Sequence, residues 1–260
     1  MRFMILRKAD KKTEAGVLPD ERLLAAFERY NAEGVKAGVL LAGEGLQPSS
    51  KGARVKFSGG RPVVTDGPFA EAKELVAGFG MIEVKSKEEA IEWVKRWPVL
   101  DGDGEVEIEI REVGCPGGLV GVSPSGSAGT SNRDGASSMR FMILLKADEE
   151  AEADFIPEEG LLAAMAKRNE EAMRAGVMLA GEGLKSSSKG ARVKFSGGRP
   201  IVTDGPFAEV KELIAGFWLI RVGSKEEAIE WVRNYPYPRR AEAEVEIRQV
   251  FEASELGVAE

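Results

Sequence analysis

The middle of the sequence occurs twice, and this repeat decides the fold. From Val39 to Phe79 the chain reads VLLAGEGLQPSSKGARVKFSGGRPVVTDGPFAEAKELVAGF, and from Val177 to Phe217 it reads VMLAGEGLKSSSKGARVKFSGGRPIVTDGPFAEVKELIAGF. The two stretches align over 41 positions at a constant offset of 138, and only six positions differ. A repeat of this length is a whole domain, because solenoid units are only about 20 to 50 residues long. The sequence therefore predicts two copies of one domain, like a homodimer fused into one polypeptide.

The ends of the repeat set the domain boundaries. The opening stretch Met1 to Leu6 returns as Met139 to Leu144, and a segment dominated by Gly and Ser separates the copies. We therefore divide the chain into a first domain (1–113), a linker (114–138), a second domain (139–251) and a tail (252–260). A Gly- and Ser-rich linker is flexible, so it lets the two halves pack about a two-fold axis.

The composition narrows the classes of function. The chain has 260 residues, a net charge of −7 and no basic excess in either half, which argues against nucleic-acid binding. It has no histidine, and its single cysteine, Cys115, lies in the linker, so we expect no disulfide, no metal site and no cofactor. The apolar runs are too short to span a bilayer, and the first ten residues lack a signal-peptide cleavage site. These features predict a cytoplasmic protein that does not bind membranes.

Apolar periodicity predicts the same elements in each half. In the first half we expect strands at 2–8, 39–46, 54–58, 61–65, 76–84 and 106–113. We expect a helix at 20–36 and a second helix that begins after Ser86 and stops near Pro98. The apolar face of the first helix comprises Leu23, Leu24, Phe27, Tyr30 and Val35. A Gly-Gly pair joins strands 54–58 and 61–65 as a hairpin.

This order of elements indicates an α+β fold. It is β-α-β-hairpin-β-α-β, a ferredoxin-like βαββαβ domain with an inserted hairpin. Helices cover only one face of such a sheet, so the other face must be covered too. The apolar alternation of Val106, Ile108 and Ile110, and of Val245 and Ile247, is expected to supply that second face. We therefore predict that the two domains pack sheet to sheet about a pseudo-two-fold axis and form an intramolecular dimeric α+β barrel.

Three spaced motifs carry a resemblance to a known family. They read GEGL at 43–46, SSKGARV at 49–55 and TDGPFAE at 65–71, and all three return in the second copy. Together they resemble the DGPF-domain branch of the YCII-related family, over both halves. The resemblance implies a dimeric α+β barrel. It also implies a link to extracytoplasmic-function sigma factors, beside which such proteins are often encoded, and it implies no established reaction.

The chain departs from its apparent relatives in one chemical respect. A His–Asp pair that could serve as general acid and base has been linked to the YCII branch, and members of the DGPF branch often carry histidine after the GEGL-like motif. This chain has Gln47 and Lys185 there, and no histidine anywhere. A histidine-based mechanism therefore does not carry over.

The remaining candidates for acid–base chemistry are carboxylates. Asp66 and Asp204 begin the DGPF motifs, where they serve either a tight turn or a general base. Glu44 and its counterpart Glu182 stand between two glycines at the end of a strand. A neighbouring carboxylate raises a carboxyl pKa, so a pair of Glu44 with Asp66 would suit acid–base work near neutral pH.

Basic residues near these motifs are candidate ligand-binding groups. Lys73 and Lys211 either belong to a solvated turn or pair with Asp66, with Asp204 or with an anionic ligand. Arg54 and Arg192 alternate with apolar residues on a hairpin arm, where outward-pointing charges are the default.

One difference between the copies concerns volume. Gly80 in the first half becomes Trp218 in the second, within otherwise similar strands. If that face of the strand lines the barrel, the first half should hold the larger cavity, and a ligand should bind beside Gly80 first.

Three functions fit these features. The first is a small-molecule-binding barrel that performs cofactor-free acid–base catalysis through Asp66 and Asp204. The alternative is a non-catalytic ligand-sensing or regulatory module linked to a sigma-factor pathway, and the third is a purely structural unit. The expected partners are an unidentified small molecule and the other half of the chain. Whether the protein is an enzyme, and whether copies assemble further, stays open at this point.

Overall fold

The structure is a computed structural model that describes residues 1–59, 61–71, 74–114, 138–236 and 242–256. Lys73 and Cys115 lie outside the described residues. The elements of the first half are β1 (Arg2–Lys8), α1 (Lys11–Glu14), α2 (Glu21–Lys36), β2 (Leu40–Gly45), η1 (Ser49–Lys51), β3 (Ala53–Ser58), β4 (Arg61–Asp66), β5 (Val76–Glu83), α3 (Lys87–Val94), η3 (Asp101–Gly104) and β6 (Val106–Glu112).

The second half repeats this order. Its elements are β7 (Met139–Lys146), α4 (Glu149–Glu152), α5 (Glu159–Arg174), β8 (Met178–Gly183), η4 (Ser187–Lys189), β9 (Ala191–Ser196), β10 (Arg199–Asp204), η5 (Val210–Glu212), β11 (Ile214–Val222), α6 (Lys225–Arg233), β12 (Glu242–Gln249) and η6 (Ala253–Glu255). The predicted α+β class and the repeat of two similar halves are confirmed.

Capping residues explain where the helices of the first half begin. The side chain of Asp20 accepts the backbone N–H of Leu23, and the side chain of Ser86 accepts that of Glu89, as expected for N-caps. The sequence analysis missed α1, whose signal is a capping box between Asp10 and Thr13. It also placed Val35 on the apolar face of α2, but this side chain is 65% exposed because it lies on the solvent side of the last turn.

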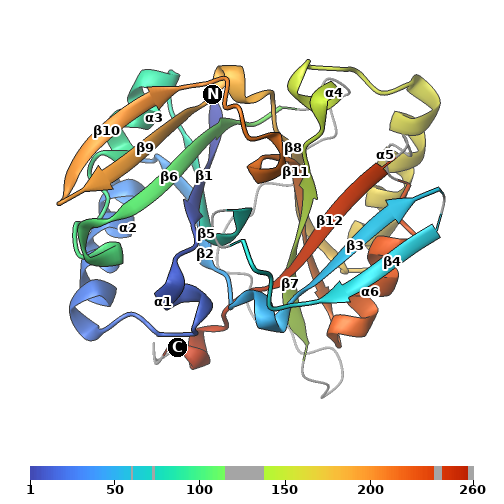
Figure 1. Cartoon of the computed structure of the whole chain (residues 1–260), viewed down its shortest axis with the longest axis horizontal. Helices are drawn as coiled ribbons and strands as arrows, with labels where there is room; N and C mark the ends of the chain where they lie inside the picture. Colours follow the sequence, from blue (N-terminus) through green and yellow to red (C-terminus); the bar gives the residue numbers. More distant parts are fainter. Residues whose placement is uncertain (60, 72–73, 115–137, 237–241, 257–260) are drawn as a thin grey trace.

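The hairpins are exchanged between the halves. The first sheet has the order β10-β9-β6-β1-β5-β2, and the second has the order β4-β3-β12-β7-β11-β8. Figure 1 shows the orange strands β9 and β10 beside the green β6, and the cyan strands β3 and β4 beside the red β12. Ile108 pairs with Val193, and Val245 pairs with Val55. Each sheet therefore takes its last two strands from the other half of the chain.

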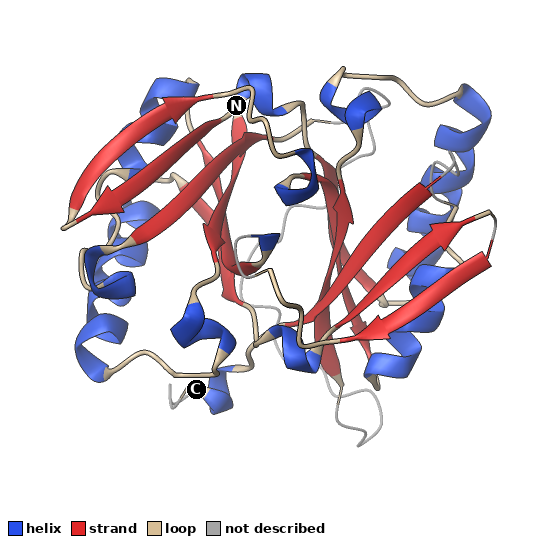
Figure 2. Cartoon of the chain, in the orientation of Figure 1, coloured by secondary structure: helices blue, strands red, loops and turns tan. Residues whose placement is uncertain are grey.

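The molecule has four layers, with the two sheets inside and the longer helices outside (Figure 2). The facing surfaces of the sheets share one apolar cluster with members from both halves, including Met4, Phe79, Met142 and Phe217. The rings of Phe79 and Phe217 lie 6.4 Å apart. The predicted packing of sheet on sheet is therefore present, and side chains fill the space at its centre. The residues expected on this face are wrong, however: Val106, Ile108 and Ile110 lie under the helices of the first sheet, and Val245 and Ile247 lie under those of the second. Each strand is buried on both faces, so its apolar alternation does not tell the two faces apart.

Charged side chains occupy the inter-sheet space beside this apolar cluster. Glu109 is fully buried, and its carboxylate contacts Lys8 at 3.5 Å, Arg111 at 3.2 Å and Arg192 at 2.9 Å. We call these four residues the Glu109 cluster. Burial alone would raise the pKa of Glu109, but the three cations outweigh burial and hold this pKa below its ordinary value. Because Arg192 comes from the exchanged hairpin, the cluster joins the two halves.

The second sheet carries the equivalent arrangement. Glu246 is 1% exposed, and its carboxylate contacts Arg248 at 3.1 Å and Arg54 at 2.9 Å. Burial alone would raise the pKa of Glu246, but Arg248, Lys146 and Arg54 lower it overall. Arg54 and Arg192 therefore do not take the default outward direction on their hairpin arms, because each arm faces the other sheet.

Close contacts fix the DGPF turn. A methyl group on Gly67 would lie 1.9 Å from the carbonyl oxygen of Ser49, and one on Gly205 would lie 1.8 Å from that of Ser187. The Ser49 hydroxyl accepts the backbone N–H of Phe69 at 3.1 Å, and the guanidinium of Arg54 lies 4.2 Å from the centre of the Phe69 ring. Neither Gly67 nor Gly205 has a positive φ, so an unusual backbone conformation does not explain the glycine. In the structure, the glycine is needed because two backbone segments touch.

Among the described residues, no helix is both long enough and apolar enough to cross a membrane. In the same part of the chain, no group of three or more Cys, Asp or Glu side chains could hold a metal ion.

Candidate functional site

A cavity of about 760 Å³ lies between α2 and the helix-facing surface of the first sheet. We call it the α2 pocket. Its roof consists of Leu23, Leu24, Phe27 and Tyr30 on α2, and strands β1, β2 and β5 form its floor. These four side chains are only partly buried, because they face empty space where a helix normally meets its sheet.

The floor of the α2 pocket is bare backbone. Gly43 pairs with Gly80 and Gly45 pairs with Gly78 across β2 and β5, so four glycines lie together. Gly78 and Gly80 share their face with Ile82, which belongs to the core under the helices. A methyl group on Gly80 would meet only ordinary contacts, 3.7 Å from the Ala42 oxygen and 3.8 Å from the Ile5 Cβ. The space above this floor is therefore open.

Aromatic rings form one side of the pocket. The centre of the Trp97 ring lies 5.5 Å from the centre of the Phe27 ring and 5.5 Å from that of the Tyr30 ring, and both rings stand edge-on to the indole. Burial raises the pKa of Tyr30 to about 12, so this phenol stays neutral at physiological pH. The result is a rigid apolar wall beside the glycine floor.

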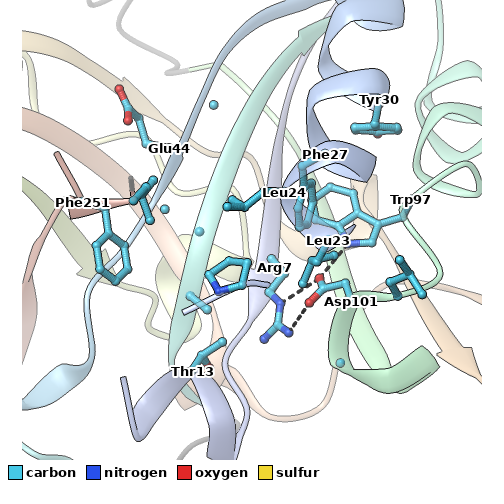
Figure 3. Close-up of a pocket in the computed structure, with 18 of the residues that line it drawn as sticks. Arg7, Thr13, Leu23, Leu24, Phe27, Tyr30, Glu44, Trp97, Asp101 and Phe251 are labelled. Atoms are coloured by element: carbon cyan, nitrogen blue, oxygen red, sulfur yellow. Dashed lines mark hydrogen bonds and ion pairs between the residues drawn. The ribbon is translucent and has the colours of Figure 1, made fainter. Parts of the chain in front are cut away.

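A hydrogen-bonded ionic network forms the polar end of the pocket (Figure 3). Arg7 holds Asp101 through two bonds, Nε to Oδ2 at 3.1 Å and Nη2 to Oδ1 at 2.7 Å, and its Nη2 also donates to Asp10 at 2.7 Å. Trp97 Nε1 donates to Asp101 at 2.8 Å. Burial alone would lower the pKa of Arg7, but Asp101 and Asp10 outweigh burial and raise it. The pocket therefore keeps a fixed positive group between two carboxylates.

The tail of the second half closes one side of the α2 pocket. Phe251 and Leu256 line the cavity, and Phe251 stands on the opposite side from Phe27 and Trp97 (Figure 3). The backbone N–H of Phe251 donates to the Gly45 oxygen at 3.0 Å. The side chain of Gln47 donates to Glu255 at 3.0 Å. Both halves of the chain therefore build this site.

In the second half, side chains fill part of the equivalent space. Trp218 packs with Met165, Trp231 and Tyr235 under α5 and α6. The centres of the Trp218 and Tyr235 rings lie 4.7 Å apart. The expectation that Gly80 and Trp218 face the barrel interior is therefore wrong. Both faces of these strands are buried, so alternation alone cannot tell the interior face from the helix-facing one.

The second half also has a cavity, of about 870 Å³, near α4 and the hairpin of the first half. The expectation that the first half holds the larger cavity is therefore wrong as well. The cavities differ in chemistry: 13 of the 27 residues that line the second cavity are Asp, Glu, Lys or Arg, against 9 of 34 in the α2 pocket. The α2 pocket is distinguished instead by the aromatic residues Phe27, Tyr30, Trp97 and Phe251 in its lining.

The candidate acids do not meet. Asp66 pairs with Lys225 and Asp204 pairs with Lys87, both at 2.7 Å, and both aspartates are largely exposed at about two thirds of their side-chain surface. Glu44 instead pairs with Arg140 at 2.5 Å. Its counterpart Glu182 pairs with Arg2. Each of the four carboxylates is therefore held by a basic residue of the other half.

The other candidate residues are spread over several places. Arg54 and Arg192 belong to the buried ionic clusters, Lys211 lines the second cavity, and Gly80 lines the α2 pocket. The Arg7–Asp101 network was missed, although one signal was present. Arg7 stands where the second copy has Leu145, and a charge at a helix-facing position of a buried strand needs a partner.

Two comparisons with known proteins bear on this chain. The family model of the YCII-related domain matches residues 1–113 and matches again at residues 139–254. A protein of Rhizobium meliloti (strain 1021), named as uncharacterized, is 36% identical over 76 residues, which are 29% of this chain and 61% of that protein. The chain thus spans less than two thirds of the length of this relative.

Proposed function

This chain belongs to the YCII-related domain family, and from that premise we propose that it binds a small molecule in the α2 pocket. One observation carries the proposal: from Leu23 to Tyr30 the inward face of α2 lies over a cavity, and the helix meets the sheet closely only further on, where Gly34 packs on Leu40. The volume of about 760 Å³ is within the usual range of roughly 300 to 1,000 Å³ for ligand sites.

The chemistry of the walls supports the same proposal. Leu24, Phe27 and Trp97 offer an apolar surface, and the Arg7–Asp101 network offers a few fixed polar atoms at one end. Such a division between apolar walls and a few polar groups is typical of ligand sites. The exposed pair of Asp66 with Lys225 gives no comparable support to acid–base catalysis at the DGPF motif, because this carboxylate is largely exposed and is held by a cation.

The substitution Gly80→Trp tests this function. A library of metabolites is screened by thermal unfolding, and we expect some compounds to raise the melting temperature of the wild type. At a concentration of about 100 times the Kd, the rise should be about 5 to 10 °C. Because the new indole fills the α2 pocket, the same compounds should leave the melting temperature of Gly80→Trp unchanged.

The matched control is Gly160→Trp, which adds the same side chain on α5 at a position with no atoms within 4 Å. It should keep the ligand response of the wild type. Compounds that stabilise Gly80→Trp and the wild type equally would place their site elsewhere and refute the proposal.

A second candidate function, ligand sensing, is favoured by the C-terminal tail. Phe251 lines the pocket of the first half, while Glu252 in the same tail segment pairs with Arg140 of the second half at 3.1 Å. A ligand in the pocket would therefore change the conformational equilibrium of the segment around Phe251 and Glu252, which contacts both halves. This candidate predicts that a compound found in the screen slows hydrogen exchange of the Phe251 amide, with the Ala147 amide of the second half as an internal control. Equal exchange with and without the compound would leave binding without a sensing role.

A further inference from the structure

The two copies differ at the position that decides what the α2 pocket contains. In the second half, a methyl group on Gly181 would lie 2.8 Å from Trp218 Cδ1 and 2.6 Å from Met178 Cε. The indole of Trp218 and the end of Met178 therefore cover this glycine. In the first half, a methyl group on Gly43 would meet only the Phe79 oxygen, at 3.6 Å. Gly181 is thus covered and its counterpart Gly43 is open, while Gly183 and Gly216 of the second half line the second cavity.

The surroundings of this space are aromatic in both halves. Trp218 packs against Tyr235, and the first-half counterpart of Tyr235 is Trp97, which borders the α2 pocket. Trp231 likewise corresponds to Trp93. The first half therefore keeps the aromatic wall against which an indole packs in the second half, but it lacks the indole itself.

We infer that the ligand of the α2 pocket carries a planar aromatic ring system of about the size of indole. The ring lies over Gly43 and Gly80 and packs against Trp97, in the place that Trp218 fills in the second half. This inference rests on the proposed function, because it concerns the same pocket. A glycine floor admits a flat ring close to the backbone, and the aromatic wall favours offset or edge-on ring contacts.

The polar end of the pocket adds a second requirement. Asp10 and Asp101 share the guanidinium of Arg7, and Lys12 pairs with Asp103 beside them. This end therefore holds three carboxylates and two cations. Burial alone would raise the pKa of Asp10, but the backbone N–H of Thr13 and the charge of Arg7 outweigh burial and lower it. An aromatic carboxylate placed here would meet like charges, so the ring carries a neutral or cationic substituent.

The first experiment uses indole as the probe on the full-length protein. Indole has nine non-hydrogen atoms, so a dissociation constant on the order of 0.1 to 1 mM is expected. We expect about 5 mM indole to raise the melting temperature of the wild type by about 3 to 6 °C. Cyclohexanol, which is apolar but not planar, should have a much smaller effect, and indole-3-acetate should bind more weakly than indole.

Two variants locate the site. Gly80→Trp should lose the response to indole, and it should fold, since a side chain begins there without a close contact and the second half already carries tryptophan at this position. Leu40→Met copies the other covering residue, Met178, and is a milder change on the same floor. It should weaken indole binding even if Gly80→Trp is unstable.

A rescue experiment checks the geometry in the second half. Trp218→Gly removes the indole from its packed site, and about 5 mM indole should then restore part of the lost melting temperature, as ligands do when they enter apolar engineered cavities. Cyclohexanol should restore much less, because the vacated space has the flat shape of an indole and lies against the Tyr235 ring.

The outcomes separate this inference from the proposed function. If non-aromatic compounds stabilise the wild type but not Gly80→Trp, and indole does nothing, the pocket binds ligands and the aromatic inference is wrong. If no compound distinguishes the wild type from Gly80→Trp, both proposals fail. Indole binding that persists in Gly80→Trp and in Leu40→Met would place the ring elsewhere and overturn the inference.

Discussion

Glu109→Ala should lower the free energy of unfolding by about 3 to 5 kcal/mol. The carboxylate of Glu109 is fully buried and is shared by Lys8, Arg111 and Arg192, so its removal leaves three cations in a space with little water. Urea unfolding measures the change. The matched control is Glu92→Ala, which breaks an exposed pair with Lys95 and should alter stability by no more than about 0.5 kcal/mol.

The same cluster gives the stability a defined pH dependence. The pKa of Glu109 is lowered in the folded state, so its contribution is fully present above the unfolded carboxyl pKa of about 4.3. It is lost as the pH falls from that value through the lower folded pKa. Between about pH 5 and pH 3 the wild type should therefore lose more stability than Glu109→Ala. Parallel acid titrations of the two proteins would contradict this role for the carboxylate.

Among the glycines in the described part of the first half, replacement of Gly67 by alanine should lower the free energy of unfolding most. The added carbon would lie 1.9 Å from the Ser49 oxygen, which cannot retreat freely because it accepts the backbone N–H of Gly52 at 2.9 Å. We expect a loss of about 3 kcal/mol or more, measured by thermal or urea unfolding. Gly205→Ala should behave alike, since its methyl group would lie 1.8 Å from the Ser187 oxygen.

The control for this prediction is Gly160→Ala. Gly160 lies in α5 with nothing within 4 Å of an added carbon, so alanine there should stabilise the helix by up to about 1 kcal/mol. A Gly67→Ala protein as stable as the wild type would show that the turn can open without strain. The DGPF glycine would then need a functional explanation.

Local elements were predictable because their signals are local. The apolar run Arg2–Lys8, the capping residues Asp20 and Ser86 and the Gly-Gly turn each determine structure over a few residues. The exchange of the hairpins was not predictable in this way. The strands Ala53–Ser58 and Ala191–Ser196 are identical in sequence, so pairing with β6 or with β12 satisfies the same pattern of side chains.

The candidate site was harder to predict than the fold. Strand alternation groups Gly78, Gly80 and Ile82 on one face, but no polar alternation marks which face points to the helices, because β5 is covered on both sides. In the DGPF motif, Asp66 to Phe69, Gly67 touches the backbone of Ser49, and Asp66 forms a surface ion pair with Lys225. The pocket instead uses Arg7 and Asp101, two residues about 90 positions apart that no short motif could connect.

The exchange of hairpins also bears on how the chain folds while it is being synthesised. When Glu112 leaves the ribosome, the strands β1, β2, β5 and β6 of the first sheet have been synthesised, but β6 still lacks its neighbour β9. The nascent first sheet must wait for the complete hairpin of β9 and β10, which ends at Asp204, 92 residues later. At about 5 to 20 residues per second, this delay lasts about 5 to 18 s. During this delay, the hairpin formed by β3 and β4 has no β12 to join, and the edge of β6 is open. Both must avoid pairing with the strands of neighbouring chains.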